Sequence, residues 1–187
     1  MLLSAADHLP EQIETPRLLI RVAKPDDGAA FNQAILDSLP QLSPWLGWVT
    51  PAPTLEASEQ SCRKAYARFL MNEDLMAFFF LKEKGTLVGG SGLHNADWHR
   101  RCFEVGYWGR SGWGGQGLMT EGVRALAEYA QHTLKANRVF LTADDANERS
   151  WRLAERAGFA WEGTLRKERF NVQGRLRDTR MYAWAVG

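Results

Sequence analysis

The sequence predicts one mixed α/β domain. Apolar runs of strand length alternate with segments whose apolar residues recur at helical spacing, and a glycine-rich turn stands between one such strand and the next helix. A length of 187 residues fits one domain of roughly 150 residues with a modest extension. We expect a polar lead-in over residues 1–13 and the domain over residues 14–187. The predicted order of a strand, two helices, three antiparallel strands and then strand–helix alternation is typical of a layered α/β fold.

Composition argues against several classes of protein. The 23 Lys and Arg nearly balance the 22 Asp and Glu, so no overall field attracts nucleic acid or an anionic membrane. No apolar run, the one that includes residues 77–81 among them, approaches the ~20 residues of a transmembrane helix. Residues 1–16 lack the features of a secretory signal, and Cys62 and Cys102 form no CxxC pattern. We therefore expect reduced thiols, no membrane contact, no direct nucleic-acid binding and a cytoplasmic location.

The first half of the chain reads as a strand followed by helices. Residues 17–22 form the strand, and Pro25 with the acids after it starts a helix that we expect to end near Pro40. Residues 42–49 mix breakers with tryptophans and predict a loop or broken helix. Thr54 is placed to cap a second helix, because apolar residues follow it at helical spacing.

Strands dominate the middle of the chain. Two apolar runs, residues 77–81 and 86–93, flank a short polar segment with Gly85, which suits the positive φ of a hairpin turn. A fourth strand follows over residues 102–108, and the glycine-rich segment at residues 109–117 comes directly after it. The next segment predicts a helix from one apolar stripe: Met119, Val123, Leu126, Ala127, Ala130 and Leu134.

The C-terminal part alternates strands with one helix. Residues 138–143 predict a fifth strand, and residues 147–157 a short helix closed by Gly158. Further strands are expected from Phe159 to Trp161, around residues 165–170 and over residues 177–186, with a turn at Gln173 and Gly174.

The glycine-rich turn predicts an anion site. Glycines at 112, 114, 115 and 117 let backbone N–H groups approach a ligand closely at a helix N-terminus, where the helix dipole favours phosphate. Leu118 stands where a Walker A loop requires Lys, and no GxGxxG register fits. The alternative is a tight turn that only packs the helix against the strand.

Several ordered motifs resemble the GNAT superfamily of N-acetyltransferases, and within it the RimJ and RimL branch that modifies the N-termini of ribosomal proteins. The matching pieces are ETPRLLIR at 14–21, FEVGYW at 103–108, GGQGLMTE at 114–121, NERS at 147–150, AGF at 157–159 and EG at 162–163. The resemblance implies a mostly antiparallel sheet whose fourth and fifth strands splay apart, flanked by about four helices. It also implies that acetyl-CoA lies in the gap between these strands.

The resemblance also implies the residues that bind the cofactor. The pantetheine arm pairs with the strand edge, the pyrophosphate lies on the N–H groups of the glycine-rich turn, and the helix near residue 150 contacts the thiol end. The implied set is Trp108, Gly109, Arg110, Gly115, Gln116, Gly117, Leu118, Met119, Thr120, Asn147 and Ser150. Gly112 stands where the family pattern has Gln or Arg, and Arg110 is the candidate to replace that side chain. Asn147 is equally suited to be an ordinary helix N-cap.

Glu104 and Ser150 are the catalytic candidates. Glu104 matches a glutamate that acts as base in some members of the superfamily, while the alternative is a solvated or salt-bridged strand residue. Glu168 and water are the other candidate bases. Many relatives carry a tyrosine that protonates the departing thiolate, but the matching residue here is Ala154, so Ser150 is the candidate acid. The oxyanion is expected to lie on a backbone N–H near Tyr107 or Trp108.

The predicted reaction is direct acetyl transfer from acetyl-CoA to a primary amine. A protein N-terminus, ribosomal or other, is the expected acceptor, because an α-amino group has a pKa of ~8 against ~10.4 for lysine and is already partly neutral near pH 7. A small-molecule amine acetyltransferase and a non-catalytic acyl-CoA-binding module remain alternatives, and the protein is expected to be a monomer or homodimer.

Other clusters have ordinary explanations. His94, Asp97 and His99 are expected to bind no metal, because their spacing is not that of a metal site. A loop between two strands accounts for them, with His94 facing the substrate as the alternative. Trp45 and Trp48 line an acceptor pocket or pack on the sheet. The basic residues between 166 and 180 predict a solvated hairpin, with contact to ribosomal RNA or an acidic peptide as the alternative.

Overall fold

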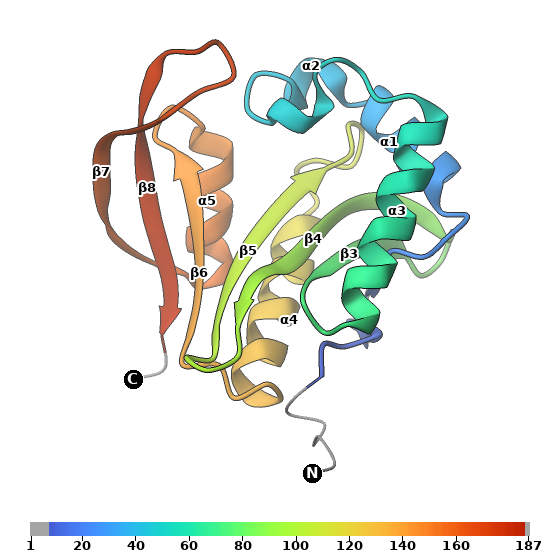
Figure 1. The fold of residues 1–187 in the computed structure, drawn as a ribbon, viewed down its shortest axis with the longest axis horizontal. Coiled ribbons are helices and arrows are strands. Elements are labelled where there is room, and N and C mark those ends of the chain that lie inside the picture. Colours follow the sequence, from blue (N-terminus) through green and yellow to red (C-terminus); the bar gives the residue numbers. More distant parts are fainter. Residues whose placement is uncertain (1–7, 186–187) are drawn as a thin grey trace.

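One eight-stranded sheet, in the order β1-β2-β3-β4-β5-β6-β8-β7, organises the molecule in the computed structural model (Figure 1). The structure describes residues 8–185, so the expected strand end at Val186 and residues 1–7 of the predicted lead-in lie outside it. The strands are β1 (Gln12–Glu14), β2 (Leu18–Val22), β3 (Leu75–Leu81), β4 (Thr86–Asp97), β5 (Cys102–Gly109), β6 (Arg138–Asp144), β7 (Ala160–Phe170) and β8 (Leu176–Ala185). The helices are α1 (Gly28–Leu36), α2 (Leu39–Leu42), the 3-10 helix η2 (Gly47–Val49), α3 (Leu55–Leu70), α4 (Leu118–His132) and α5 (Glu148–Ala157).

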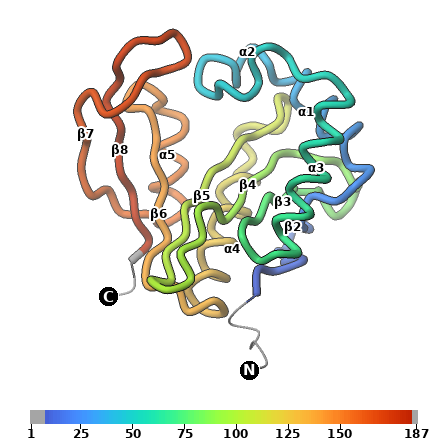
Figure 2. The backbone as a smooth tube through the Cα atoms, in the orientation of Figure 1, coloured from blue at the N-terminus to red at the C-terminus, as the bar shows by residue number. Residues whose placement is uncertain are grey.

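The sheet divides between β5 and β6. All other neighbours pair antiparallel, but β5 and β6 pair parallel and over only three residue pairs, of which the last joins Glu104 to Phe140. Beyond Glu104 the two strands separate, and Figures 1 and 2 show them diverging toward α2 and the tip of the β7–β8 hairpin. The resemblance implied that the fourth and fifth strands splay apart. These strands are β5 and β6, and the splay is confirmed.

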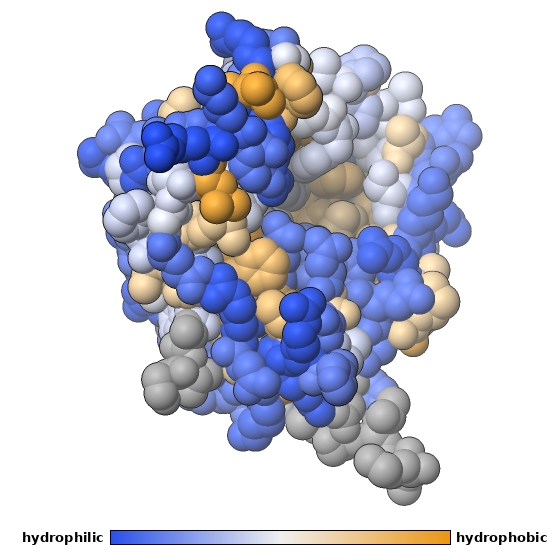
Figure 3. Space-filling model, turned by 60° about the vertical axis from the view of Figure 1, so that its left-hand side comes forward, coloured by the Kyte–Doolittle hydropathy of each residue, from blue (hydrophilic) through white to orange (hydrophobic). Residues whose placement is uncertain are grey.

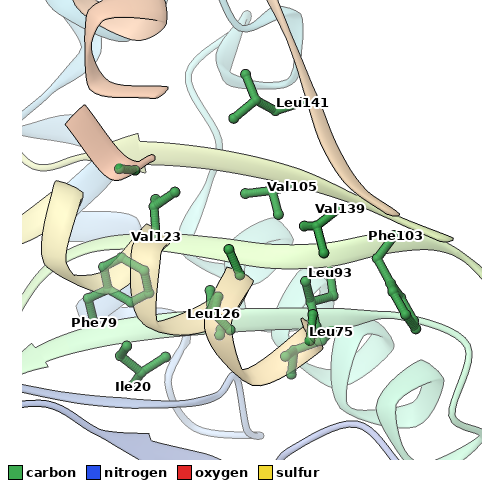
Figure 4. Packing of buried hydrophobic residues seen from close by; sticks show 14 of the residues in the cluster. Ile20, Leu75, Phe79, Leu93, Phe103, Val105, Val123, Leu126, Val139 and Leu141 are labelled. Carbon is green, nitrogen blue, oxygen red and sulfur yellow. The ribbon is translucent and has the colours of Figure 1, made fainter. Parts of the chain in front are cut away.

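Helices cover both faces of the sheet. α4 lies on one face, where Phe79 approaches Gly122 so closely that an added Cβ would lie 2.3 Å from the ring. Figure 4 shows Val123 and Leu126 of α4 among the buried side chains of the strands. On the opposite face, residues of α1 and α3 pack against Phe78 and Trp108. Because successive strand residues face opposite sides, the two layers bury alternate residues of the same strands.

Helix boundaries near Pro40 differ from the expectation. The first helix ends at Leu36, and Pro40 lies instead in the first turn of the short helix α2, where its missing N–H is not needed. The broken segment at residues 42–49 is confirmed, since α2 gives way to η2. Thr54 caps α3 as predicted, accepting a hydrogen bond from the Ala57 N–H at 3.1 Å.

The elements around the glycine-rich turn follow the prediction closely. Gly85 has φ +61° in the β3–β4 turn, and Gly158 ends α5 with φ +104°. The predicted apolar stripe is buried, apart from Met119, which is partly exposed, but α4 ends at His132 and Leu134 lies beyond it. The two expected strand segments after residue 158 form one strand, β7, whose pairing with β8 shifts register near Gly163 and Lys167. No helix among residues 8–185 is long and apolar enough to span a bilayer.

Candidate active site

A cleft of about 1800 Å³ occupies the space where β5 and β6 separate. Its walls come from β5, α4, β6 and α5, and residues of α2, η2 and the β7–β8 hairpin border it at the end toward the hairpin tip. Glu104, the last residue of β5 that pairs with β6, lies at the fork. All predicted cofactor and catalytic residues line this cleft except Gln116.

The end of β5 is anchored to the first helices. The carbonyl of Gly109 accepts a hydrogen bond from Gln41 Nε2 at 2.9 Å. Arg110 Nη2 lies 2.6 Å from Oδ2 of Asp37, the residue that follows α1, so its guanidinium is held there rather than free for a ligand. This contact lowers the pKa of Asp37. Trp108 is buried against the helical layer of α1.

The glycine-rich turn leaves an open surface in front of α4. Gly112, Gly115 and Gly117 have φ of +85°, +78° and +74°, the left-handed region that favours glycine. An added Cβ at Gly114 or Gly115 would meet no protein atom within 4 Å. Gly117 is the N-cap of α4 and offers no side-chain oxygen. The N–H groups of Leu118, Met119 and Thr120 precede the first intrahelical bond, and all three residues line the cleft.

Arg17 holds this turn in place. Its Nη1 donates to the Gln116 carbonyl at 2.8 Å. Its Nε lies 2.6 Å from Glu121 Oε2 in the first turn of α4. Thr15 Oγ1 donates to the other oxygen of Glu121 at 2.6 Å. Burial raises the pKa of Glu121, but these bonds outweigh it and leave the pKa below its ordinary value.

The N-terminus of α5 faces β5 across the cleft. Asn147 caps the helix, and its Oδ1 accepts from the Ser150 N–H at 3.2 Å. Tyr107 of β5 donates to the Ser150 carbonyl at 2.8 Å, and its oxygen is 3.1 Å from Ser150 Oγ. Burial raises the pKa of Tyr107 to about 12. Ala154 is fully buried in α5 and takes no part in the cleft lining.

The two candidate bases lie in different places. Glu104 is half-buried at the fork, and its Oε2 accepts a hydrogen bond from Asn95 Nδ2 at 2.8 Å. Glu168 lies outside the cleft lining, where its Oε2 accepts from Thr179 Oγ1 at 2.9 Å. The hydrogen bond from Arg169 lowers the pKa of Glu168. Only Glu104 of the two therefore reaches the cleft.

The cleft has an aromatic and charged border at the end toward the tip of the β7–β8 hairpin. Trp45 and Trp48 line it and are 39% and 51% exposed, so they are available to a ligand. Arg177 Nη1 lies 3.5 Å from Asp144 Oδ2, and both also line the cleft. The outer face of β7 and β8 mixes hydrophilic with scattered hydrophobic side chains (Figure 3).

His94 does not belong to this site. Its Nδ1 lies 2.6 Å from Asp74 Oδ1, away from the cleft. Asp97 instead holds Arg100, with its Oδ1 accepting from the Arg100 N–H at 2.9 Å. Within residues 8–185 no group of three or more His, Cys, Asp or Glu is arranged to hold a metal ion.

Sequence reasoning missed three side chains of the site. The Tyr107 hydroxyl reaches α5, and Arg169 and Arg177 reach the cleft from the hairpin. Tyr107 shares the alternation of the buried Phe103 and Val105, which places it on the face covered by α4 and α5. That signal was present in the sequence. The two arginines belong to the basic cluster that predicts a solvated hairpin or a peptide or RNA contact, but their place in the cleft depends on how β7 pairs with β8.

A family model described as the acetyltransferase (GNAT) domain matches residues 17–160. YdaF of Bacillus subtilis, which bears the name "putative ribosomal N-acetyltransferase", is 29% identical over 166 residues, covering 89% of this chain and 90% of that protein. The ribosomal-protein-serine acetyltransferase of Escherichia coli is 24% identical over 141 residues, covering 74% and 78%.

Solved structures share the fold. RimL, a ribosomal L7/L12 alpha-N-protein acetyltransferase in complex with coenzyme A, superposes with a TM-score of 0.87 at 21% identity, covering 94% of this chain and 98% of that one. MccE, a microcin C7 self-immunity acetyltransferase in complex with acetyl-CoA and AMP, gives 0.86 at 18% identity, covering 96% and 99%. The extent of the family match decides the assignment: the chain belongs to the GNAT family of acetyltransferases.

Proposed function

We propose that the protein transfers acetyl from acetyl-CoA to the α-amino group of a protein N-terminus. The observation that carries this proposal is the cleft itself, which runs from the uncapped N-terminus of α4 to Glu104 at the fork of β5 and β6. When bound, acetyl-CoA supplies an activated acetyl thioester. The family of the chain and the names of its relatives support the same reaction.

The residues of the glycine-rich turn fit a diphosphate. Left-handed glycines leave the N–H groups uncovered, and an anion at a helix N-terminus is favoured by the helix dipole. We assign the pyrophosphate to Gly115, Gly117 and the first turn of α4. Asn147 and Ser150 then lie at the pantetheine and thiol end, and the edge of β5 from Trp108 to Arg110 lies beside the pantetheine arm.

Glu104 is our candidate for the base. It lies where β5 and β6 separate, in the same cleft that Trp45 and Trp48 line, and we place the entry of the amine past these two tryptophans. The carboxylate takes the proton of the attacking nitrogen, directly or through water. A backbone N–H near Tyr107 or Trp108 on the unpaired edge of β5 holds the developing oxyanion.

The cleft border favours a peptide as acceptor. A small amine calls for an enclosed acidic pocket, whereas this cleft is open and Arg169 and Arg177 stand there beside Glu104 and Asp144. Relatives named for ribosomal proteins support an acceptor of that class. We propose a cytoplasmic location for the same reason.

A thiol-release screen tests the proposed function. N-terminal peptides of ribosomal and other proteins are compared with amino sugars, polyamines and other small amines, and the acetylated atom is identified by mass spectrometry. We expect release of coenzyme A with peptides and acetylation at the α-amino group. Turnover with small amines only supports the small-molecule alternative. Binding of coenzyme A without turnover on any amine supports a non-catalytic module.

A further inference from the structure

The hydroxyl of Tyr107 links the two separated sides of the cleft. Tyr107 belongs to β5 and Ser150 to the first turn of α5, and both line the cleft. At this level β5 no longer pairs with β6, because their last pair is Glu104 with Phe140. The contact between Tyr107 and Ser150 therefore joins β5 to α5 where backbone pairing is missing.

The number of protons defines the direction of these hydrogen bonds. A phenol has one proton, and a carbonyl oxygen can only accept. Tyr107 uses its proton on the Ser150 carbonyl at 2.8 Å. The second contact, 3.1 Å between the two hydroxyl oxygens, is then a bond donated by Ser150 Oγ to Tyr107. In this arrangement the Ser150 proton points at Tyr107, and the lone pairs of Ser150 are left for a ligand.

We propose that Tyr107 is a positioning residue that acts through Ser150, because the two hydroxyls form a hydrogen-bond chain that turns toward the coenzyme A sulfur as the thiolate leaves. This inference rests on the proposed function, which places the thiol end of the cofactor beside Ser150. The Ser150 proton turns from Tyr107 to the sulfur. The Tyr107 proton turns from the Ser150 carbonyl to Ser150 Oγ, which is already 3.1 Å away. No covalent bond forms or breaks.

Charge drives this rearrangement. Hydrogen bonds to a charged acceptor are about twice as strong as neutral ones, so a thiolate attracts the Ser150 proton and a neutral thioester does not. Each bond in such a chain also polarises the next. Because burial raises the pKa of Tyr107 to about 12, the phenol stays protonated at the pH where amines react. Ala154 offers no hydroxyl at the position that holds the acid in many relatives, so the Tyr107–Ser150 pair is left to donate a hydrogen bond to the thiolate, which takes its proton from solvent.

The pKa of the thiol of bound coenzyme A reports on the Tyr107–Ser150 hydrogen-bond chain in the absence of an acceptor amine. Coenzyme A is titrated in complex with the protein, and the thiolate is followed by its ultraviolet absorbance. In the wild type we expect a thiol pKa about one unit below the ordinary value of ~8.5. Ser150→Ala and Tyr107→Phe should each lose most of that shift. With acetyl-CoA and an accepted amine, kcat should fall about tenfold in either variant while the KM for acetyl-CoA changes less than twofold.

The double variant separates positioning from simple bracing. Ser150→Ala keeps the carbonyl that Tyr107 binds but removes the hydroxyl link, so Tyr107→Phe should then change neither the thiol pKa nor kcat further. Equal effects of Tyr107→Phe in both backgrounds would mean that Tyr107 only braces α5, and would overturn the proposal. Tyr66→Phe removes a phenol of α3 outside the cleft and serves as the control.

The remaining outcomes are also decisive. If Tyr107→Phe does not fold, Ser150→Thr provides the test, because it keeps the hydroxyl and should retain the shift in thiol pKa that Ser150→Ala loses. Loss of the shift in both Ser150 variants would contradict the proposed hydrogen-bond chain. An unshifted thiol in the wild-type complex also contradicts it. If coenzyme A binds with a shifted thiol but no peptide is acetylated, the acceptor assignment fails and this inference stands. If coenzyme A does not bind, both fail.

Discussion

Arg17 and Glu121 join the start of β2 to the first turn of α4. Nε and Nη2 of Arg17 each lie 2.6 Å from Glu121 Oε2, and the Arg17 N–H donates to Glu121 Oε1 at 3.0 Å. The same guanidinium holds the carbonyl of Gln116. The arrangement fixes the orientation of the turn whose N–H groups we assign to the pyrophosphate.

Loss of Arg17 should loosen that turn. We expect Arg17→Ala to weaken coenzyme A binding about three- to tenfold, since about 1 kcal/mol is typical of one hydrogen bond. Isothermal titration calorimetry measures the affinity. Arg100→Ala removes an exposed arginine that pairs with Asp97 away from the cleft, and it should leave the affinity unchanged. Equal affinities of the two variants would contradict this account of Arg17.

The same pair predicts a pH dependence of stability. The pKa of Glu121 is lowered in the folded protein from 4.5, so the ionised carboxyl stabilises the fold above pH 4.5 and this contribution is lost as the pH falls through the folded value. We expect Glu121→Gln to cost about 1 kcal/mol at neutral pH and progressively less as the pH falls below 4.5. Urea unfolding of both proteins at neutral pH and at a series of lower pH values gives the difference. A pH-independent difference would contradict the prediction.

Gly115 is needed both for the left-handed backbone conformation of the turn and for the close approach of the ligand. Gly115 and Gly85 both have positive φ, and an added Cβ at either meets no protein atom within 4 Å. Alanine at either position should therefore cost about 1–2 kcal/mol of stability from the left-handed backbone. Only Gly115→Ala should also weaken coenzyme A binding, by about tenfold or more, because its Cβ obstructs the pyrophosphate. Calorimetric titration of the two variants checks this, and equal affinities would remove Gly115 from the site.

Glu104→Gln tests the base. We expect kcat to fall about 100-fold, the lower end for removal of a general base, with little change in affinity for acetyl-CoA. Glu168→Gln is the matched variant, since Glu168 lies outside the cleft lining, and it should keep near wild-type kcat. Steady-state kinetics across pH decide between them. Unchanged turnover of Glu104→Gln at every pH would mean that Glu168 or water removes the proton from the attacking amine.

Asn147 should contribute to binding as well as to capping. Asn147→Ala and Thr54→Ala each remove a helix N-cap, of α5 and α3, and each should cost about 1 kcal/mol of stability. Only Asn147 lines the cleft, so only Asn147→Ala should raise the KM for acetyl-CoA, by about fivefold for a lost hydrogen bond. Thermal unfolding and kinetics are measured on both. If the KM for acetyl-CoA rises in neither variant, Asn147 acts only as a helix cap.

Local patterns were sufficient for the elements around the cofactor. The buried stripe of α4, the Asn147 and Gly158 ends of α5, and Gly85 in the hairpin turn all depend on neighbours within one or two turns of chain. Such signals are legible in sequence because capping and helical burial are short-range. The same signals did not reveal β1, three residues long, whose pairing with β2 defines it.

What the sequence determined by itself was the series of elements and the motif that marks an acetyltransferase. The tertiary structure alone decided which side chains meet. Glu104 stands at the fork because β6 pairs with β5 over three residues only, and Tyr107 finds Ser150 because α5 packs behind that fork. Glu168 is turned from the cleft by the register shift of β7 between Leu165 and Arg169. These contacts join residues far apart in the chain, and a strand slipped by one residue presents its other face.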